Sequence, residues 1–231
     1  MELHQFRQSP FCDKVRLVLA AKGLSYSIVE VTPGVGQIAL FKLSGQRQVP
    51  VLVDGETVVA DSTAIALHLE RSHPAPPLLP TDPQLRAQAL LLEDWADTSL
   101  AQAVRTALIQ AAAVDPALRT ALLPSATPAP IKQLVNAVPS ALGSWAETLG
   151  ESVLGSSGRQ QLQANLEHLQ TLLSRQNYLV GQSLTLADLA VVAQLSLLRP
   201  EGLAVPGLGD NPLLEPLFSW CDQILAGLAP A

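Results

Sequence analysis

Three short segments carry residue types that could bind an anionic peptide and stabilise a thiolate. The first is Ser9-Pro10-Phe11-Cys12, in which Ser9 suits a helix N-cap and Pro10 suits the first helical position. The free amides and the dipole of a helix start favour a nearby anion. A hydroxyl placed there can donate a hydrogen bond to a bound thiolate and lower the pKa of that thiol. The plain alternative is a capped helix without chemistry.

The other two segments supply main-chain and carboxylate groups for the rest of such a peptide. Val49-Pro50 opens a β-rich run, and a cis bond there would expose the main-chain groups of Val49 to an extended peptide. Asp61-Ser62 directly precedes a helical pattern. The Ser62 hydroxyl and the helix amides suit a carboxylate, and Asp61 suits an ammonium group. An ordinary strand-start proline and an ordinary N-cap are the alternatives.

The cysteines and histidines do not form a disulfide framework or a metal site by spacing. Two cysteines, Cys12 and Cys221, are too few for either, and the four histidines do not cluster. Cys12 falls in a first helical turn, which lowers a thiol pKa, yet this position generally points inward. A direct role for Cys12 and a buried structural role both stay open. Cys221 lies in an apolar C-terminal pattern and is expected in the core.

Composition excludes several classes of function. The chain has 231 residues, of which 48% are hydrophobic and 15% charged, enough for a sizeable core. A net charge of −6 without a basic stripe argues against a nucleic-acid partner. The N-terminus lacks the features of a signal peptide, and the most apolar stretch, Leu184 to Leu198, is too short to span a bilayer easily. We therefore expect a soluble cytoplasmic protein without a membrane partner.

Strand and helix signals alternate only in the first part of the chain. Strands are predicted at 3–6, 26–31, 49–53 and 56–60, with a hairpin turn at Asp54-Gly55, and helices at 10–22, 38–43 and 61–73. The early strand–helix–strand unit favours parallel pairing, and the hairpin favours antiparallel pairing. The proline-rich stretch 74–83 predicts a linker. Beyond it only helices are predicted, at 85–113, 131–154, 160–175, 185–198 and 212–228, with Pro139 kinking or ending the second of these.

Two local patterns in the helical part predict opposite environments. Thr185 and Asp188 form a capping box in which Asp188 reaches back to the Thr185 amide, before a helix that is apolar on nearly every face. Such a helix belongs in the middle of a bundle. The acidic cluster Glu93, Asp94 and Asp97 predicts a solvated helix face.

Taken together, these segments resemble the glutathione transferase superfamily. The order of motifs that carries the resemblance is Ser9-Pro10-Phe11, Gln48-Val49-Pro50-Val51-Leu52, Asp61-Ser62-Thr63-Ala64-Ile65 and Thr185-Leu186-Ala187-Asp188. The resemblance implies an α/β thioredoxin-like domain over 1–73, a linker over 74–83 and an all-helical domain over 84–231. Against it, Ser44-Gly45 stands where many relatives have Asn-Pro. The first motif is also similar to a glutaredoxin Cys-Pro-x-Cys whose nucleophilic cysteine has become Ser9, which excludes dithiol exchange there.

The resemblance also implies roles for the matching residues. Ser9 would activate the glutathione sulfur, and Val49, before a cis Pro50, would pair its backbone with the cysteinyl part. Asp61 and Ser62 would hold the γ-glutamyl end, while Gln48 contacts the glycyl end or stays solvated.

The implied activity is transfer of the glutathione thiol to a small hydrophobic electrophile, which would bind in an apolar pocket between the domains. Glutathione would act there as co-substrate without a metal, and the resemblance implies a homodimer. Two alternatives stay open. One is a glutathione-dependent isomerase, which consumes no glutathione, and the other is a non-catalytic ligand-binding or interaction protein with the same fold.

Overall fold

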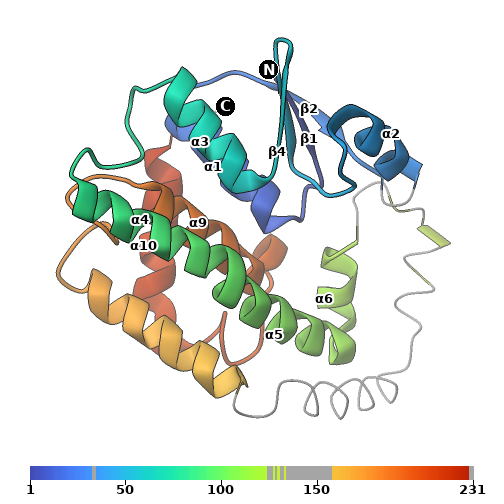
Figure 1. Ribbon diagram of the computed structural model, residues 1–231. Helices are drawn as coiled ribbons and strands as arrows, with labels where there is room; N and C mark the ends of the chain where they lie inside the picture. Colours follow the sequence, from blue (N-terminus) through green and yellow to red (C-terminus); the bar gives the residue numbers. More distant parts are fainter. Residues whose placement is uncertain (33–34, 124–126, 128, 131–132, 134–157, 229–231) are drawn as a thin grey trace. The chain divides into compact units, whose positions relative to one another are not determined.

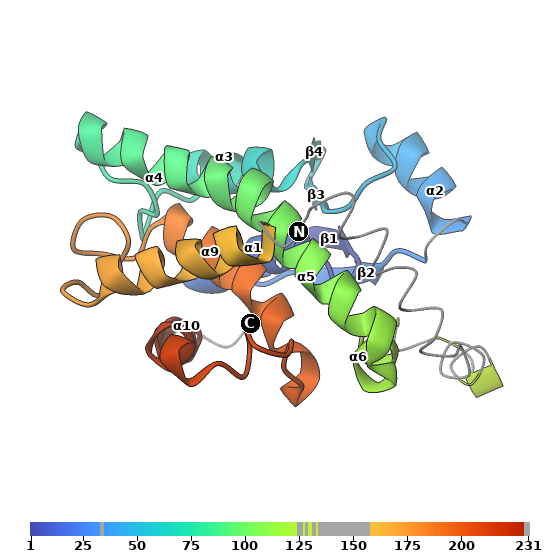
Figure 2. The same ribbon diagram turned by 90° about the horizontal axis from the view of Figure 1, so that it is seen from below.

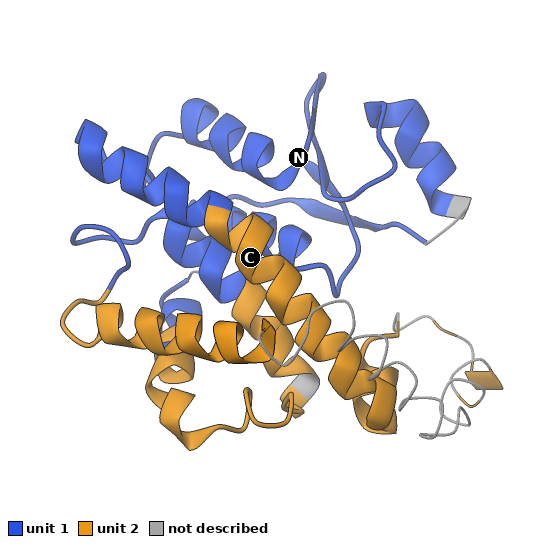
Figure 3. Cartoon of the chain, turned by 60° about the horizontal axis from the view of Figure 1, so that its bottom comes forward, with its two compact units in different colours: residues 1–94, 178–193, 222–231 blue, residues 95–177, 194–221 orange. Residues whose placement is uncertain are grey.

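The computed structural model describes residues 1–32, 35–123, 127, 129–130, 133 and 158–228. The chain divides into two compact units, which Figure 3 colours separately. The first contains residues 1–94, 178–193 and 222–231, and the second contains residues 95–177 and 194–221. The first unit therefore holds the predicted domain 1–73 together with segments that follow the predicted linker.

A four-stranded mixed sheet forms the frame of the first unit (Figure 1). Its strands are β1 (Glu2–Gln5), β2 (Ser27–Glu30), β3 (Val51–Asp54) and β4 (Thr57–Ala60), in the order β2-β1-β3-β4. β1 pairs with β2 in parallel, while β3 runs antiparallel to both β1 and β4. The parallel and antiparallel pairings predicted from the sequence are confirmed.

The hairpin between β3 and β4 turns one residue later than predicted. Asp54 and Thr57 are paired in the ladder, so the two loop residues are Gly55 and Glu56 rather than Asp54 and Gly55. Gly55 has a φ of 61° at the first loop position, a backbone conformation that glycine adopts without steric cost. The requirement for glycine at this position sets the register of the turn.

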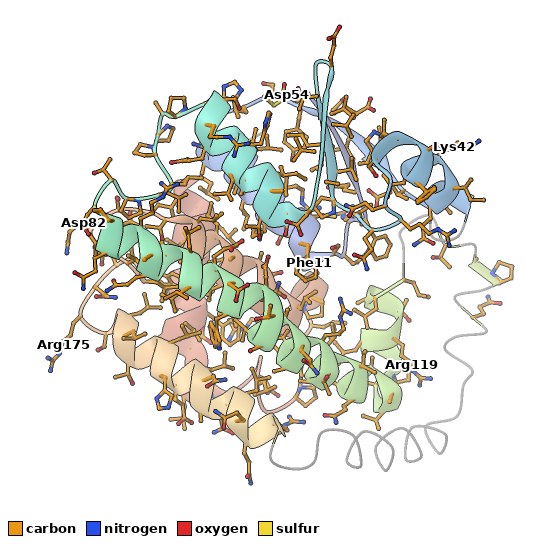
Figure 4. The ribbon with its side chains drawn as sticks, in the orientation of Figure 1. Phe11, Lys42, Asp54, Asp82, Arg119 and Arg175 are labelled. Carbon is orange, nitrogen blue, oxygen red and sulfur yellow. The ribbon has the colours of Figure 1, made fainter. Side chains whose placement is uncertain are left out.

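Three helices cover the two faces of this sheet. α1 (Pro10–Ala21) and α3 (Ser62–Ser72) contact one another on one face, and α2 (Val35–Ser44) lies on the other face (Figures 1 and 2). α2 buries Leu40 against a cluster that contains Val31 and Val51. α2 contacts β4, and its Lys42 side chain extends away from the sheet (Figure 4). Asp61 stands between the end of β4 and the start of α3, whereas residues 6–9 form the turn from β1 to α1 and end in Ser9.

The described chain after β4 is helical and contains no further strand. After α3 the segments are α4 (Pro83–Trp95), the π-helical η1 (Ala96–Leu100), α5 (Ala101–Val114), α6 (Pro116–Ala121), a helix over 158–173, α9 (Leu186–Leu195), the 3₁₀ turns η2 (Ser196–Leu198), η3 (Pro200–Gly202) and η4 (Pro212–Leu214), and α10 (Glu215–Gly227). The helix predicted over 131–154 and its Pro139 lie outside the described residues. Among the helices that were searched, none is long and apolar enough to cross a membrane.

The predicted capping box begins α9. The Asp188 carboxylate accepts hydrogen bonds from the Thr185 main-chain N–H and from the Thr185 hydroxyl, both at 2.7 Å. Its other oxygen accepts from the N–H of Leu179, also at 2.7 Å, so one buried side chain joins the preceding loop to the helix start. Burial raises the pKa of Asp188, and these hydrogen bonds oppose that shift. Every residue from 185 to 195 is buried, as predicted for a central helix.

Candidate functional site

Ser9 caps the start of α1, as its type predicts. Its backbone is extended, with φ of −80° and ψ of 122°, and Pro10 follows as the first helical residue. The Ser9 Oγ accepts a long hydrogen bond of 3.4 Å from the N–H of Cys12. Among the residues that the structure describes, none accepts a hydrogen bond from the Ser9 hydroxyl. The hydroxyl can therefore donate to a ligand without losing an internal partner.

A hollow of about 150 Å³ lies in the first unit beside the start of α1. Its lining residues are Phe11, Gln46, Gln48, Val49, Pro50, Asp61 and Ser62. The fold thus brings together five of the six residues proposed from the sequence, although they come from two separate segments. Ser9 is not among the lining residues, and α1 reaches the hollow through Phe11, two residues further on, which Figure 4 labels.

Two lining residues, Phe11 and Gln46, were not proposed as site residues. Phe11 lies within the Ser-Pro-Phe-Cys motif, so its position close to Ser9 in the sequence could have identified it as a site residue. Gln46 has no such signal, since it follows α2 in an irregular segment. Its side-chain amide donates to the carbonyl of Gln48 at 3.5 Å, which links the two glutamines along the rim of the hollow.

The main chain of Val49 is open for pairing. The Val49–Pro50 peptide bond is cis, and the β3 ladder begins only at Val51. Neither the N–H nor the carbonyl of Val49 makes a hydrogen bond to another described residue. Val49 therefore offers one main-chain N–H donor and one carbonyl acceptor, which suit pairing with the backbone of an extended peptide.

Asp61 holds the start of α3 in an unusual conformation. It has a φ of 79° and is the only residue other than glycine with a positive φ in the described chain. Its Oδ1 accepts hydrogen bonds of 3.0 Å from the N–H groups of both Thr63 and Ala64, while Oδ2 makes no hydrogen bond or ion pair with another described residue. Strained backbone of this kind clusters at ligand sites, and the open oxygen suits an ammonium group. Ser62, next to it, is 2% exposed as the first residue of α3.

Cys12 does not present a reactive thiolate. Its side chain is 0% exposed, and its sulfur accepts a hydrogen bond of 3.5 Å from the N–H of Phe6. The position in the first helical turn favours a lower thiol pKa, but burial has the larger effect and raises the pKa of Cys12. The structural interpretation of Cys12 is therefore the one that the geometry supports. Cys221 is also buried, as predicted.

Glu93 corrects the prediction of a solvated acidic face. Its side chain is 3% exposed and pairs with the 1% exposed Lys14, with 2.6 Å between Lys14 Nζ and Glu93 Oε1. The Thr63 hydroxyl donates to the same Oε1 at 2.6 Å and accepts from Lys14 Nζ at 3.1 Å. Three side chains from α1, α3 and α4 thus meet inside the first unit. The contact fixes the helix starts that carry Ser9 and Asp61 relative to one another.

Metal-ligating side chains do not gather among the described residues, where no group of three or more His, Cys, Asp or Glu side chains could hold a metal ion. His68 instead pairs through Nε2 with Asp54 Oδ2 at 2.9 Å. The hollow itself is lined by hydroxyl, carboxylate, side-chain amide and main-chain groups.

A thioredoxin-like sheet with an amide-rich site at two helix starts, followed by helices, defines the class of protein as a glutathione-transferase fold. A model of the glutathione S-transferase N-terminal domain matches residues 3–77, and a model of the glutathione S-transferase C-terminal domain matches residues 155–221. The chain belongs to the glutathione S-transferase superfamily.

Its curated relatives differ in how much of the chain they match. Glutathione S-transferase Z1 of Arabidopsis thaliana is 38% identical over 90 residues, which is 38% of this chain and 41% of that protein. The chain thus spans about two fifths of the length of such relatives. FtsZ-localized protein A of Caulobacter vibrioides is 27% identical over 202 residues, which is 85% of this chain and 76% of that protein.

Solved structures share the fold over nearly the whole chain. FzlA from C. crescentus has a TM-score of 0.68 at 26% identity, covering 100% of this chain and 95% of that one. The β-etherase LigF from Sphingobium sp. strain SYK-6 has a TM-score of 0.71 at 24% identity, covering 97% and 94% of the two chains. At that identity the likeness to LigF shows the fold alone.

Proposed function

We propose that this protein is a glutathione-dependent transferase that conjugates the glutathione thiol to small electrophilic substrates. The observation that carries the proposal is the hollow in which the unpaired main chain of Val49 and the open Oδ2 of Asp61 are brought together. Glutathione is an extended, anionic peptide with one ammonium group. Val49 would pair with its cysteinyl part, Asp61 would bind its ammonium, and Ser62 with the α3 amides would hold the neighbouring carboxylate.

The sulfur would then lie near the start of α1. The Ser9 hydroxyl, whose proton has no acceptor in the described chain, would donate to the thiolate, and the dipole of α1 would favour the same charge. Lowering a thiol pKa by about two units requires about 2.7 kcal/mol, which one charge-assisted hydrogen bond and a helix dipole can supply. The thiol proton leaves to solvent, and the thiolate electron pair then forms the S–C bond with the electrophile held close to it, as a leaving group departs with its bonding pair or as a π bond opens and is protonated from solvent. Gln48 would contact the glycyl end.

Two substitutions test these roles separately. Ser9→Ala should lower kcat about a hundredfold and raise the pKa of the bound thiol, while the free energy of unfolding falls by only about 1 kcal/mol through the lost cap. Asp61→Asn keeps the Oδ1 cap and removes the charge, so it should raise KM for glutathione and leave kcat nearly unchanged. Full activity of Ser9→Ala, with loss of activity in Cys12→Ala, would contradict the role of Ser9.

Electrophile turnover is measured by loss of free glutathione and by the mass of the product. A conjugate that contains glutathione supports the transferase, whereas turnover without consumption of glutathione indicates an isomerase. The proposal extends to a small hydrophobic electrophile as second substrate, a homodimer and a cytoplasmic location. Light scattering of the purified protein tests the homodimer.

A non-catalytic binding or interaction protein is the second candidate. The observation that favours it is the long match, over 85% of this chain, to a relative named for its localisation rather than for a reaction. Retention on immobilised glutathione without turnover of any electrophile in a broad panel would support this candidate. Absence of retention would contradict the transferase.

A further inference from the structure

The turn between β1 and α1, which leads into Ser9, is held by a closed ring of hydrogen bonds. The N–H of Arg7 donates to Glu30 Oε1 at 2.7 Å, and Glu30 Oε2 accepts from Gln5 Nε2 at 3.1 Å. Gln5 Oε1 accepts from Arg16 Nη1 at 2.7 Å. Arg16 Nη2 then returns to the carbonyl of Arg7 at 3.0 Å, so both polar main-chain groups of Arg7 are fixed by the same ring.

Each position in the ring uses the donor and acceptor pattern of its residue type. Gln5 and Glu30 are register partners at the ends of β1 and β2, which places their side chains side by side beneath the turn. A carboxylate accepts on both oxygens, an amide donates at one end and accepts at the other, and a guanidinium donates in a fork. Gln5 is 3% exposed and Glu30 is exposed, so the ring is buried at Gln5 and open to solvent at Glu30. Arg16 Nη2 also pairs with Asp13 Oδ1 at 3.0 Å.

The ring is linked to Ser9 through the turn itself. The N–H of Ser9 donates to the carbonyl of Phe6 at 2.9 Å, and the N–H of Phe6 donates to the sulfur of Cys12 at 3.5 Å. The N–H of Cys12 in turn donates to Ser9 Oγ at 3.4 Å. Arg7 lies inside this turn, so fixing its two main-chain groups fixes the path of the chain into the N-cap.

We infer that Gln5, Arg16 and Glu30 are positioning residues, which hold the Ser9 hydroxyl at the place where it meets the sulfur of bound glutathione. The inference rests on the proposed function. None of the three lines the hollow, and the inference assigns them no direct contact with the peptide. Their effect should therefore fall on kcat and on the pKa of the bound thiol, rather than on KM for glutathione.

Two conservative substitutions break the ring while keeping its size. Arg16→Lys retains the positive charge but cannot donate to Gln5 and to Arg7 through one rigid fork. Glu30→Gln retains the shape but replaces one carboxylate oxygen by an amide NH₂. This group cannot accept the hydrogen bond that Gln5 Nε2 or the N–H of Arg7 donates at that position. The readouts are kcat and KM for glutathione, the ultraviolet absorbance of the bound thiolate against pH, and hydrogen exchange of the peptide that contains residues 6–12.

The matched control is Glu70→Gln on α3, whose partner Lys22 caps the C-terminal end of α1. Glu70 Oε2 pairs with the buried Lys22 at 2.7 Å, so this change weakens a comparable contact away from Ser9. We expect Arg16→Lys and Glu30→Gln to lower kcat about tenfold, to raise the bound-thiol pKa by about one unit and to speed exchange in residues 6–12, with KM changed less than about threefold. The control should lose stability and leave kcat and the thiol pKa unchanged.

Unchanged exchange over 6–12 in both ring variants would overturn the inference, and so would a thiol pKa equal to that of the wild type. An effect of Glu30→Gln without an effect of Arg16→Lys would also overturn it, because charge rather than geometry would then act. If the wild type binds glutathione without a lowered thiol pKa, the proposed role of Ser9 fails, and faster exchange in the variants would show that the ring still positions the turn.

Discussion

Removing one partner of the buried pair between Lys14 and Glu93 should destabilise the first unit strongly. Glu93→Leu removes the carboxylate that lies 2.6 Å from Lys14 Nζ, and it leaves the ammonium group in a site where the Lys14 side chain is 1% exposed. Lys14→Met leaves a carboxylate that is 3% exposed. Breaking a buried ion pair in this way costs about 3–5 kcal/mol, because the remaining charge loses this ion-pair contact and stays shielded from water.

The double variant Lys14→Met/Glu93→Leu separates the charge from the packing. It removes both charges and keeps most of the side-chain volume, so it should be within about 2 kcal/mol of the wild type. The coupling energy in the double-mutant cycle should then be about 3 kcal/mol or more. The Thr63 hydroxyl loses its hydrogen bonds to Lys14 and Glu93, which accounts for part of the residual loss.

Urea unfolding of the four proteins, followed by circular dichroism, measures the cycle. As a control, Glu215→Gln neutralises a carboxylate whose side chain is 56% exposed beside Arg199, and it should leave the unfolding midpoint nearly unchanged. Additive single-variant effects, or losses below about 1 kcal/mol for each, would refute the reasoning that this pair is a desolvated structural contact.

Two further predictions follow from buried titratable groups. Asp188→Asn should lower the free energy of unfolding by about 2 kcal/mol or more in urea, because one oxygen that accepts from Leu179 or Thr185 becomes an amide donor; an unchanged midpoint would contradict this. The raised pKa of Cys12 means that the folded chain keeps the thiol proton to a higher pH than the unfolded chain. The contribution of this shift to stability is present below the ordinary thiol pKa of 9.0 and is lost as pH rises through the folded value. At pH 8 the thiol of the native protein should resist a thiol reagent that labels it rapidly in denaturant. Fast labelling of the native protein would contradict the burial of Cys12.

Short-range chemistry made much of the frame predictable from the sequence. The N-cap at Ser9, the carboxylate at Asp61 and the box formed by Thr185 and Asp188 depend on side chains that bond main-chain groups within a few residues. Alternating apolar residues and a glycine turn likewise predict the β3–β4 hairpin. The predicted turn lies one residue too early, because the sequence alone does not determine whether Asp54 or Glu56 pairs in the ladder.

The sequence alone determined which residue types were available for a peptide site and the order in which they occur. Only the tertiary structure decided that Gln46 and Phe11 join the hollow, and that Glu93 is buried rather than solvated. Glu93 pairs with a lysine 79 residues earlier in the chain, and no local pattern carries that information. The physical reason is that burial and desolvation depend on which segments pack together, whereas caps and turns depend on the few residues beside them.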